Sequence, residues 1–349
     1  MEEQLIPRQE KYFQTLKSAK LHPHVEFTLL KISGTPRIQY VCSTHPPNET
    51  RKLATFLESK INEMISWIID PMGETTIQPD LIHSKECLGI PDYITYRSAL
   101  YTAYKRMALD NDPHSPLVSL THSTEHATTE EMNIGKSQID AQWLFYDAQN
   151  RLSPNQFSTA LAIRLNILSP SLFRAQIKCN CGETIQTSSD MIAHTLKCDQ
   201  MSPVTHTTRH NMVRDAIVQT IRQYGITTSS EPRCFTYQND VHQRPDIMAH
   251  TKPQHLVTDV TLIHEHIDIT LAEKNKHKTH LEACAKQGCI FIPFAMYTRG
   301  TLGQQAEKFI NTISKAILPS LQRTFKNDLK HAVSVAAAKA RAITHTQTE

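Results

Sequence analysis

Two aspartates, Asp246 and Asp259, each accompany a short apolar run in the C-terminal half of the chain. The runs, 245–248 and LVTDVTLI at 256–263, are rich in apolar and β-branched residues, which predicts strands of a buried sheet. The aspartates are 13 positions apart in the sequence, which is enough for one strand to end, turn and return and would set the carboxylates side by side. A buried carboxylate is costly without a partner or a metal ion. Two of them beside a lysine can hold a divalent metal against a phosphate, which is nuclease chemistry.

The lysine-rich run EKNKHKTH at 273–280 supplies the ammonium group. It is predicted to begin a helix that continues through LEACAKQG. Lys276 is our first choice for the catalytic lysine, and Lys274 and Lys278 remain alternatives. Lys276 and His280 are four residues apart and therefore share one helix face.

A predicted amphipathic helix, 209–226, precedes these strands and is expected to stop at Gly225. Arg209, His210 and Asn211 stand at its expected beginning. The first turn of a helix attracts phosphate, so these residues are candidates for a contact beside the cut. The alternative is an Asn cap next to a solvated basic pair.

Three cysteines and a histidine form a separate cluster: Cys179, Cys181, His194 and Cys198. Twelve residues separate Cys181 from His194, and three separate His194 from Cys198. Three thiolates and one imidazole are the ligands that a tetrahedral structural zinc site takes, and Gly182 eases the sharp turn after the first pair. All four positions are filled by protein, so a structural role is expected and the alternative is free thiols.

Composition limits the other possibilities. The chain of 349 residues is 39% hydrophobic and 20% charged, enough for two or three domains with a real core. No apolar stretch approaches the roughly 18 residues of a membrane span, so no membrane partner is expected. The polar N-terminus is unlike a signal peptide, and eight cysteines then indicate thiols or metal ligands. A net charge of +3 does not by itself indicate nucleic-acid binding.

The remaining pattern predicts an α+β multidomain protein. Apolar residues at three- and four-residue spacing predict helices in KYFQTLKSA, RKLATFLESKINEMISWIID and YRSALYTAYKRMAL, and again after residue 141. CIFIPFAMY predicts another strand and LGQQAEKFINTISKAIL another helix. The resulting helix–strand–strand–helix–strand–helix order matches the restriction-endonuclease-like PD-(D/E)xK fold, a central mixed sheet flanked by helices.

The amino-acid sequences of several stretches resemble one protein family. LLKISGTPRIQYVCSTHPP, TFLESKINEMISWI and CLGIPDYITYRSALYTAY resemble, in this order, the region after the palm of non-LTR retrotransposon reverse transcriptases, which includes the helical thumb that grips the primer–template. The cysteine–histidine cluster resembles the family's CCHC element, and Arg209, His210 and Asn211 resemble its Arg/Lys-His-Asn signature. RPDI…VTDVT…K…IFIPF…LG, over about residues 205–318, resembles its endonuclease domain.

This resemblance implies a metal-dependent endonuclease that nicks target DNA, so that the freed 3′-hydroxyl primes reverse transcription of the element's RNA. Asp246 and Asp259 would hold Mg²⁺, with Mn²⁺ as a substitute, while Lys276 and His210 act on the water and the phosphate. Arg209, Asn211, Lys274, Lys278 and His280 would contact DNA. The implied partners are target DNA and the element's RNA or an RNA–DNA hybrid, and the implied location is the nucleus. The oligomeric state is left open.

Two departures from the family pattern stand out. Ordinary PD-(D/E)xK enzymes carry lysine two residues after the second acid, where this chain has Thr261, and the retrotransposon branch moves it to the following helix. That branch usually has Lys-x-x-x-Tyr, whereas here His280 follows Lys276.

The polymerase Asp-Asp motif and the length for fingers and palm are missing, which implies the C-terminal part of a larger polyprotein. A catalytically inactive nucleic-acid-binding remnant is therefore the alternative function.

The expected domain organisation follows from these patterns. It comprises a helical, thumb-like region at 1–107, a linker at 108–140, a helical connector at 141–178, the CCHC zinc module at 179–204, the nuclease domain at 205–318 and a C-terminal helical tail at 319–349. For the tail, packing on the core, contact with nucleic acid and fraying are all left open.

Overall fold

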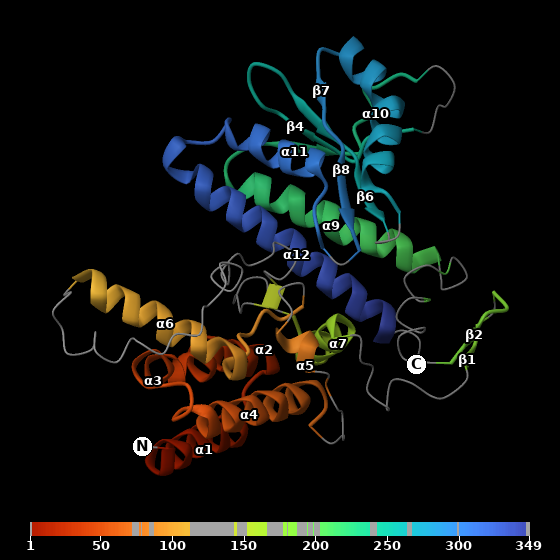
Figure 1. The fold of residues 1–349 in the computed structure, drawn as a ribbon. Helices are drawn as coiled ribbons and strands as arrows, with labels where there is room; N and C mark the ends of the chain where they lie inside the picture. Colours follow the sequence, from red (N-terminus) through yellow and green to blue (C-terminus); the bar gives the residue numbers. More distant parts are fainter. Residues whose placement is uncertain are drawn as a thin grey trace. The chain divides into compact units, whose positions relative to one another are not determined.

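The computed structural model describes residues 2–71, 77, 79–83, 87–111, 143–144, 152–165, 177–179, 181–186, 194, 198, 203–237, 243–263, 267–298 and 300–346. The chain forms two compact units, Met1–Gln138 and Ile139–Glu349 (Figure 1). The fold is α+β, with mostly helices and a small mixed sheet, as the coarse fold class predicted. No described helix combines the length and apolar character needed to cross a bilayer.

The N-terminal unit is helical. Its α-helices are α1 (Glu2–Ser18), α2 (Pro23–Leu29), α3 (Gln39–Thr44), α4 (Arg51–Ile69), α5 (Pro79–His83) and α6 (Tyr93–Asn111), and η1 (Leu30–Gly34) and η2 (Thr35–Ile38) connect α2 to α3. α4 lies at the centre and packs against α1, α2 and α6. Its buried residues recur at three- and four-residue spacing, among them Leu53, Leu57, Ile61 and Ile65, so one face of the helix supplies the core.

Helix α6 ends at Asn111, two residues beyond the predicted stretch YRSALYTAYKRMAL, and takes in the first four residues of the predicted linker. The rest of that linker, 112–140, lies outside the described residues.

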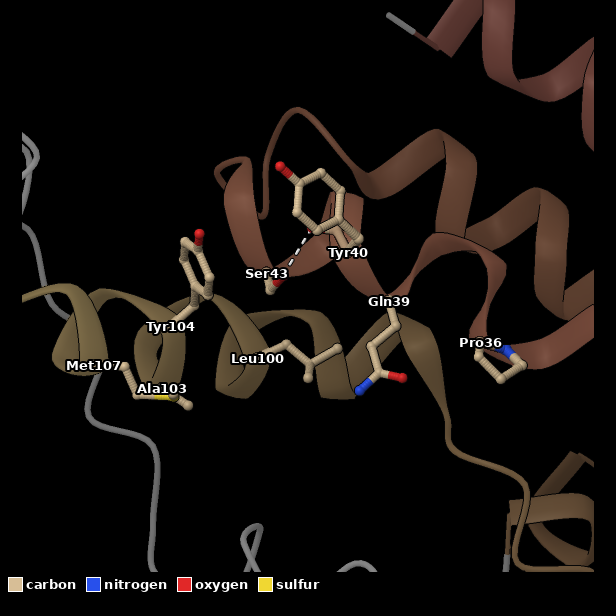
Figure 2. Close-up of a pocket in the computed structure, with 8 residues that line it drawn as sticks. All are labelled: Pro36, Gln39, Tyr40, Ser43, Leu100, Ala103, Tyr104 and Met107. Carbon is tan, nitrogen blue, oxygen red and sulfur yellow. Dashed lines mark hydrogen bonds between the residues drawn. The ribbon is translucent and has the colours of Figure 1, made fainter. Parts of the chain in front are cut away.

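An open pocket lies between the α6 side and the η2–α3 side of the N-terminal unit (Figure 2). Tyr40, Tyr104 and Met107 line it and are large hydrophobic residues that stay exposed, with Tyr40 71% exposed. Leu100 forms part of the floor between them. The pocket is therefore an apolar surface feature and not part of the core.

A buried carboxylate ties α4 to the chain that leads into α6. Glu58 accepts a hydrogen bond from the Tyr93 N–H at 2.7 Å, and its Oε2 lies 3.1 Å from Nε2 of His83. Nδ1 of His83 lies 2.9 Å from the carbonyl oxygen of Ile90 and therefore donates to it. Burial alone would lower the pKa of His83, but the hydrogen bonds to Glu58 and to the Ile90 carbonyl outweigh it and raise the pKa.

The C-terminal unit is built on a mixed sheet of order β3-β4-β5-β7. Its strands are β3 (Thr228–Ser230), β4 (Ile247–Ala249), β5 (Leu256–Thr258) and β7 (Ile290–Phe291), antiparallel except for the parallel β5–β7 pair. The chain then continues from β5 into β6 (Val260–Ile263) and from β7 into β8 (Phe294–Tyr297), and β6 and β8 pair in parallel. Each long apolar run of the sequence therefore forms two short strands, and Asp259 is the single residue between β5 and β6.

Helices cover both faces of this sheet (Figure 1). Ile247 and Leu256 face a large core that includes α9 (Pro203–Gln223), α11 (Gln304–Ser314) and α12 (Gln322–Thr346). Met248 and Val257, the neighbouring residues, face the opposite side, where α10 (Ile269–Lys286) packs. This is the alternation expected of strands that are buried on both faces.

The C-terminal helix α12 packs along α9 and also against α7 (Pro154–Arg164) and α11. Phe325, Leu329 and Val333 are buried in the large core. The described part of the tail therefore packs on the core.

The beginning of α9 differs from the prediction. The helix begins at Pro203, six residues before Arg209, and proline is favoured at the first position of a helix because its missing N–H is not needed there. The predicted stop is confirmed, since the helix ends at Gln223 and Gly225 has φ +81°. Arg209, His210 and Asn211 thus lie inside the helix, and the phosphate seat expected at the helix N-terminus is wrong for them.

We expect Glu58→Gln to lower the free energy of unfolding by roughly 1.5–3 kcal/mol at about pH 6, the range for hydrogen bonds to charged groups. The raised pKa of His83 makes this stabilisation fully present below the pKa of an unfolded histidine and lost as the pH rises through the folded value. The loss should therefore be smaller at about pH 9. Chemical denaturation at both pH values measures it.

Glu63→Gln is the control, because Glu63 pairs with Lys17 and Lys60 on the surface and should contribute little. An equal loss for Glu58→Gln at both pH values would show that His83 is not charged beside Glu58.

Candidate active site and metal centre

The β4–β5 hairpin brings Asp246 and Asp259 to the same end of the sheet. Ile247 pairs with Thr258, so Asp246, one residue before, and Asp259, one residue after, continue the same register. Oδ2 of Asp246 accepts a hydrogen bond from the N–H of Val260 at 2.6 Å. The first carboxylate is thus fixed directly to the chain that follows the second.

His210 of α9 reaches this end of the sheet. Its Nε2 lies 3.0 Å from Oδ2 of Asp246, and its Nδ1 lies 3.4 Å from Oδ1 of Asn211. The hydrogen bond to Asp246 raises the pKa of His210, against the opposing effect of burial. His210 therefore reaches the aspartates from within α9, and not from the beginning of the helix.

Asp259 is only 5% exposed and is held by two residues of α10. Nζ of Lys276 lies 2.7 Å from Oδ1, and Nε2 of His280 lies 3.0 Å from Oδ2. Burial raises the pKa of Asp259, but the hydrogen bond from His280 and the charge of Lys276 outweigh it, and the pKa is lowered overall. Asp259 is therefore an anion in the folded protein.

Among the three candidate lysines, Lys276 is the one that contacts Asp259. Lys274 and Lys278 lie two residues away on α10 and are exposed. They point away from the aspartates because residues two apart on a helix do not share a face. Arg209 is buried, at 5% exposure, so it offers little surface for a DNA contact.

The cysteine cluster is also assembled. One ligand atom each from Cys179, Cys181, His194 and Cys198 lies within 4.8 Å of the others. Sγ of Cys179 lies 3.6 Å from Sγ of Cys198, and Sγ of Cys181 lies 3.6 Å from Nε2 of His194. Ligands at the corners of a tetrahedron around zinc are separated by about 3.7 Å, so the four atoms fit one metal ion.

The local structure explains this arrangement. β1 (Ile177–Lys178) and β2 (Thr184–Ile185) form a small hairpin, and Gly182, at φ +94°, takes the turn that an L side chain would strain. The N–H of Cys198 donates to the carbonyl of His194 at 2.9 Å, which is the spacing of a helical turn. The Cys179–Cys181 pair therefore lies at the turn of a hairpin, and the His194–Cys198 pair has the hydrogen bond of a helical turn, as expected.

A second group with metal-ligating side chains lies in the N-terminal unit and comprises Glu58, His83 and Asp92. Glu58 and His83 already pair with each other, and Asp92 caps α6 by accepting hydrogen bonds from the N–H groups of Ile94 and Thr95. This set is accounted for by the ion pair and the helix cap.

Three contacts in the C-terminal unit were not predicted. Tyr237 donates or accepts a hydrogen bond at His280, Glu183 holds Nδ1 of His194 at 2.8 Å, and Glu273 accepts from the N–H of Gln305 at 2.9 Å. A Cβ on Gly303 would lie 2.3 Å from Oε1 of Glu273, so a larger residue there would require the Glu273 side chain to shift. Of these three residues, only Glu183 could have been found from the sequence, because it lies two residues after the predicted ligand Cys181.

No family model matches the chain. The sequence is similar to a retroelement protein, which supports a retrotransposon-related origin. That protein is the Retrotransposable element SLACS 132 kDa protein of Trypanosoma brucei gambiense, with 19% identity over 333 residues. The match covers 87% of this chain and 27% of the trypanosome protein, so the chain spans about a quarter of its relative's length.

We expect the pKa of His210, in metal-free protein, to lie above the ordinary histidine value of about 6.5, because Asp246 stabilises the imidazolium. Asp246→Asn should lower it. Titration of the imidazole signals by NMR measures both values.

Asp215→Asn serves as the control, since Asp215 lies on the same helix but pairs with Arg214. The pairing of His210 with Asp246 would be contradicted by the same His210 titration in wild type and Asp246→Asn.

Proposed function

We propose that this chain is a metal-dependent DNA endonuclease of a retroelement, which nicks one strand of target DNA. One observation carries the proposal: an aspartate just before β4 and an aspartate just after β5 lie at the same end of the sheet, each bound to a basic residue of a separate helix. Metal-dependent phosphodiester cleavage uses anions that hold a metal ion beside cations that bind the phosphate. The similarity to a retroelement protein supports the biological context.

The proposed domain is restriction-endonuclease-like and spans about residues 205–318. The order α9, β4, β5–β6, α10, β7–β8, α11 supports it, as does a sheet covered by helices on both faces. The extra edge strand β3 is compatible with a mixed sheet of this kind.

The donor set suits Mg²⁺, which prefers carboxylate oxygens and retains several waters. Asp246 and Asp259 would hold it. Among the described residues, no hydrogen bond or ion pair reaches Oδ1 of Asp246, which leaves that oxygen available as a ligand. When bound, the ion would polarise the scissile phosphate and lower the pKa of a bound water.

The chain's own residues have distinct roles in the proposal. Lys276, 35% exposed at its side chain, would steady the attacking water or the charge that develops on the phosphate. His210, 31% exposed at its side chain, would contact the phosphate next to the cut. Both groups are fixed by the aspartates before DNA binds, so little reorganisation is needed. Lys274 and Lys278, exposed on the same helix as Lys276, would bind the DNA backbone further from the cut.

We propose that the cysteine cluster would hold zinc in a structural role. Three thiolates and one imidazole would fill a tetrahedral coordination sphere and leave no position for a catalytic water. Glu183 supports this assignment: its carboxylate lies 2.8 Å from Nδ1 of His194, so that nitrogen donates and Nε2 is left as the ligand.

The N-terminal unit is proposed to contact the element's RNA or an RNA–DNA hybrid. The exposed rings of Tyr40 and Tyr104 at the pocket of Figure 2 support this, because aromatic faces stack on bases of any sequence. The proposed site of action is the nucleus, as the resemblance of the sequence to non-LTR retrotransposons implies.

The central test is nicking of supercoiled plasmid with Mg²⁺. We expect Asp246→Asn and Asp259→Asn each to reduce the nicking rate by roughly 100-fold or more, because the charge that holds the ion is lost. Removal of divalent ions with a chelator should abolish nicking, and Mn²⁺ should restore it.

Asp215→Asn is again the matched control and should nick at the wild-type rate, because this aspartate pairs with Arg214 on the surface of α9. Nicking that persists in the chelator, or full activity of Asp259→Asn, would exclude this mechanism.

The zinc assignment has a separate test. We expect about one zinc ion per purified chain by atomic emission, and its loss in Cys198→Ser because three ligands bind zinc far more weakly than four. Cys234→Ser, an exposed cysteine outside the cluster, should keep the ion. Equal zinc content in all three proteins would refute the assignment.

The second candidate is a nucleic-acid-binding protein without nuclease activity. One observation favours it: both oxygens of Asp259 are already engaged, by Lys276 and by His280, so this carboxylate is neutralised without a metal. A gel shift that weakens with salt, without nicking in Mg²⁺ or Mn²⁺, would support it over the nuclease.

A further inference from the structure

Asp259 begins a chain of hydrogen-bonded groups, two buried and one half-buried, and the proposed mechanism does not use the two groups beyond Asp259. Oδ2 of Asp259 lies 3.0 Å from Nε2 of His280, and Nδ1 of His280 lies 2.6 Å from the hydroxyl of Tyr237. His280 is 2% exposed, so water has little access to the imidazole. Tyr237 is 43 positions away from His280 in the sequence, which makes this contact a product of the fold.

The imidazole of His280 is also fixed by packing. The ring of Tyr237 meets it edge-on, with centroids 5.5 Å apart and planes at 83°, and the ring of Phe291 lies 5.1 Å away. Phe235, two residues before Tyr237, is buried in the core on the α10 side of the sheet with Val257. This anchor holds the segment that carries Tyr237 against α10.

The donors and acceptors in the chain Asp259–His280–Tyr237 follow from the ionised state of Asp259. Asp259 beside Lys276 is ionised and can only accept, so Nε2 of His280 carries a proton. In a neutral imidazole the other nitrogen is then an acceptor, and the Tyr237 hydroxyl must donate to it. Burial raises the pKa of Tyr237, so the hydroxyl keeps the proton that it donates.

We propose that Tyr237 is a positioning residue for Asp259: its hydroxyl donates to Nδ1 of His280 and fixes the tautomer whose Nε2–H holds Oδ2 of Asp259. Because His280 fixes Oδ2, the carboxylate cannot rotate freely, and Oδ1 stays oriented towards Lys276. The catalytic consequence rests on the proposed nuclease function, whereas the tautomer does not. Partners of this kind, which orient a metal-binding side chain through another group, typically contribute about 10- to 100-fold to activity or metal affinity.

The first test reads the tautomer directly, in full-length, metal-free protein with ¹⁵N-labelled histidine. In wild type the ¹⁵N signals of His280 should show a protonated Nε2 and an unprotonated, hydrogen-bonded Nδ1. In Tyr237→Phe the Nδ1 signal should lose the hydrogen-bond shift, and the second tautomer should become populated. A doubly protonated His280 in wild type, or signals unchanged by Tyr237→Phe, would overturn the proposal.

Tyr224→Phe is the matched control. It also removes one tyrosine hydroxyl from the C-terminal unit, where it binds Asp328 at 2.5 Å, and it should leave the His280 signals and the nicking rate unchanged. Thermal unfolding of both variants separates a general loss of stability from the specific effect.

The second test is a double-mutant cycle on plasmid nicking. Tyr237→Phe should lower kcat by about 10-fold with little change in KM for DNA, because Asp259 acts on the ion and not on DNA binding. In a His280→Gln background, Tyr237→Phe should add nothing further, since Tyr237 acts through His280. Additive effects of the two substitutions, or a Tyr237→Phe enzyme as active as Tyr224→Phe, would overturn the positioning role.

The two tests separate this inference from the proposed function. If wild type does not nick DNA, the nuclease proposal fails and the ¹⁵N signals of His280 still decide whether Tyr237 sets the tautomer. If wild type nicks and the signals do not respond to Tyr237→Phe, the positioning role fails and the nuclease stands.

Discussion

A carboxylate that is removed from water requires opposite charge or hydrogen-bond donors, and Asp259 has both in Lys276 and His280. The requirement shapes the surrounding structure. It places α10 close enough to the sheet for two residues, one helical turn apart, to reach the same side chain. Asp259 also stands where one apolar run divides, between β5, which pairs with β7, and β6, which pairs with β8.

Asp246 is held by a backbone N–H and a histidine of another helix. Its carboxylate binds the N–H of Val260, which is the backbone group next to Asp259, and His210 from α9. The two aspartates therefore draw their cations from helices on opposite faces of the sheet. Each of the two neighbouring negative groups thus has its own compensating partner, which suits the proposed site for a metal ion and a phosphate.

Much of this was predictable from the sequence. The spacing of Asp246 and Asp259 predicted the hairpin, and the four-residue spacing of Lys276 and His280 predicted a shared helix face, because hairpins and helices have fixed local geometry. The cysteine cluster was predictable for the same reason, since its ligands are close in sequence. The beginning of α9 was not, because the apolar pattern used to predict it weakens before residue 209 while Pro203 starts the helix earlier.

The sequence by itself determined the local elements and the residue types: the strands around the aspartates, the lysines on one helix, and the four ligands for a metal. Only the tertiary structure decided that Lys276, and not its neighbours, meets Asp259, that His210 reaches Asp246 from the middle of a helix, and that Tyr237 stands behind His280. The physical reason is that periodicity fixes directions within an element. Distances between elements depend on how their buried faces pack together, and no short-range pattern contains that information.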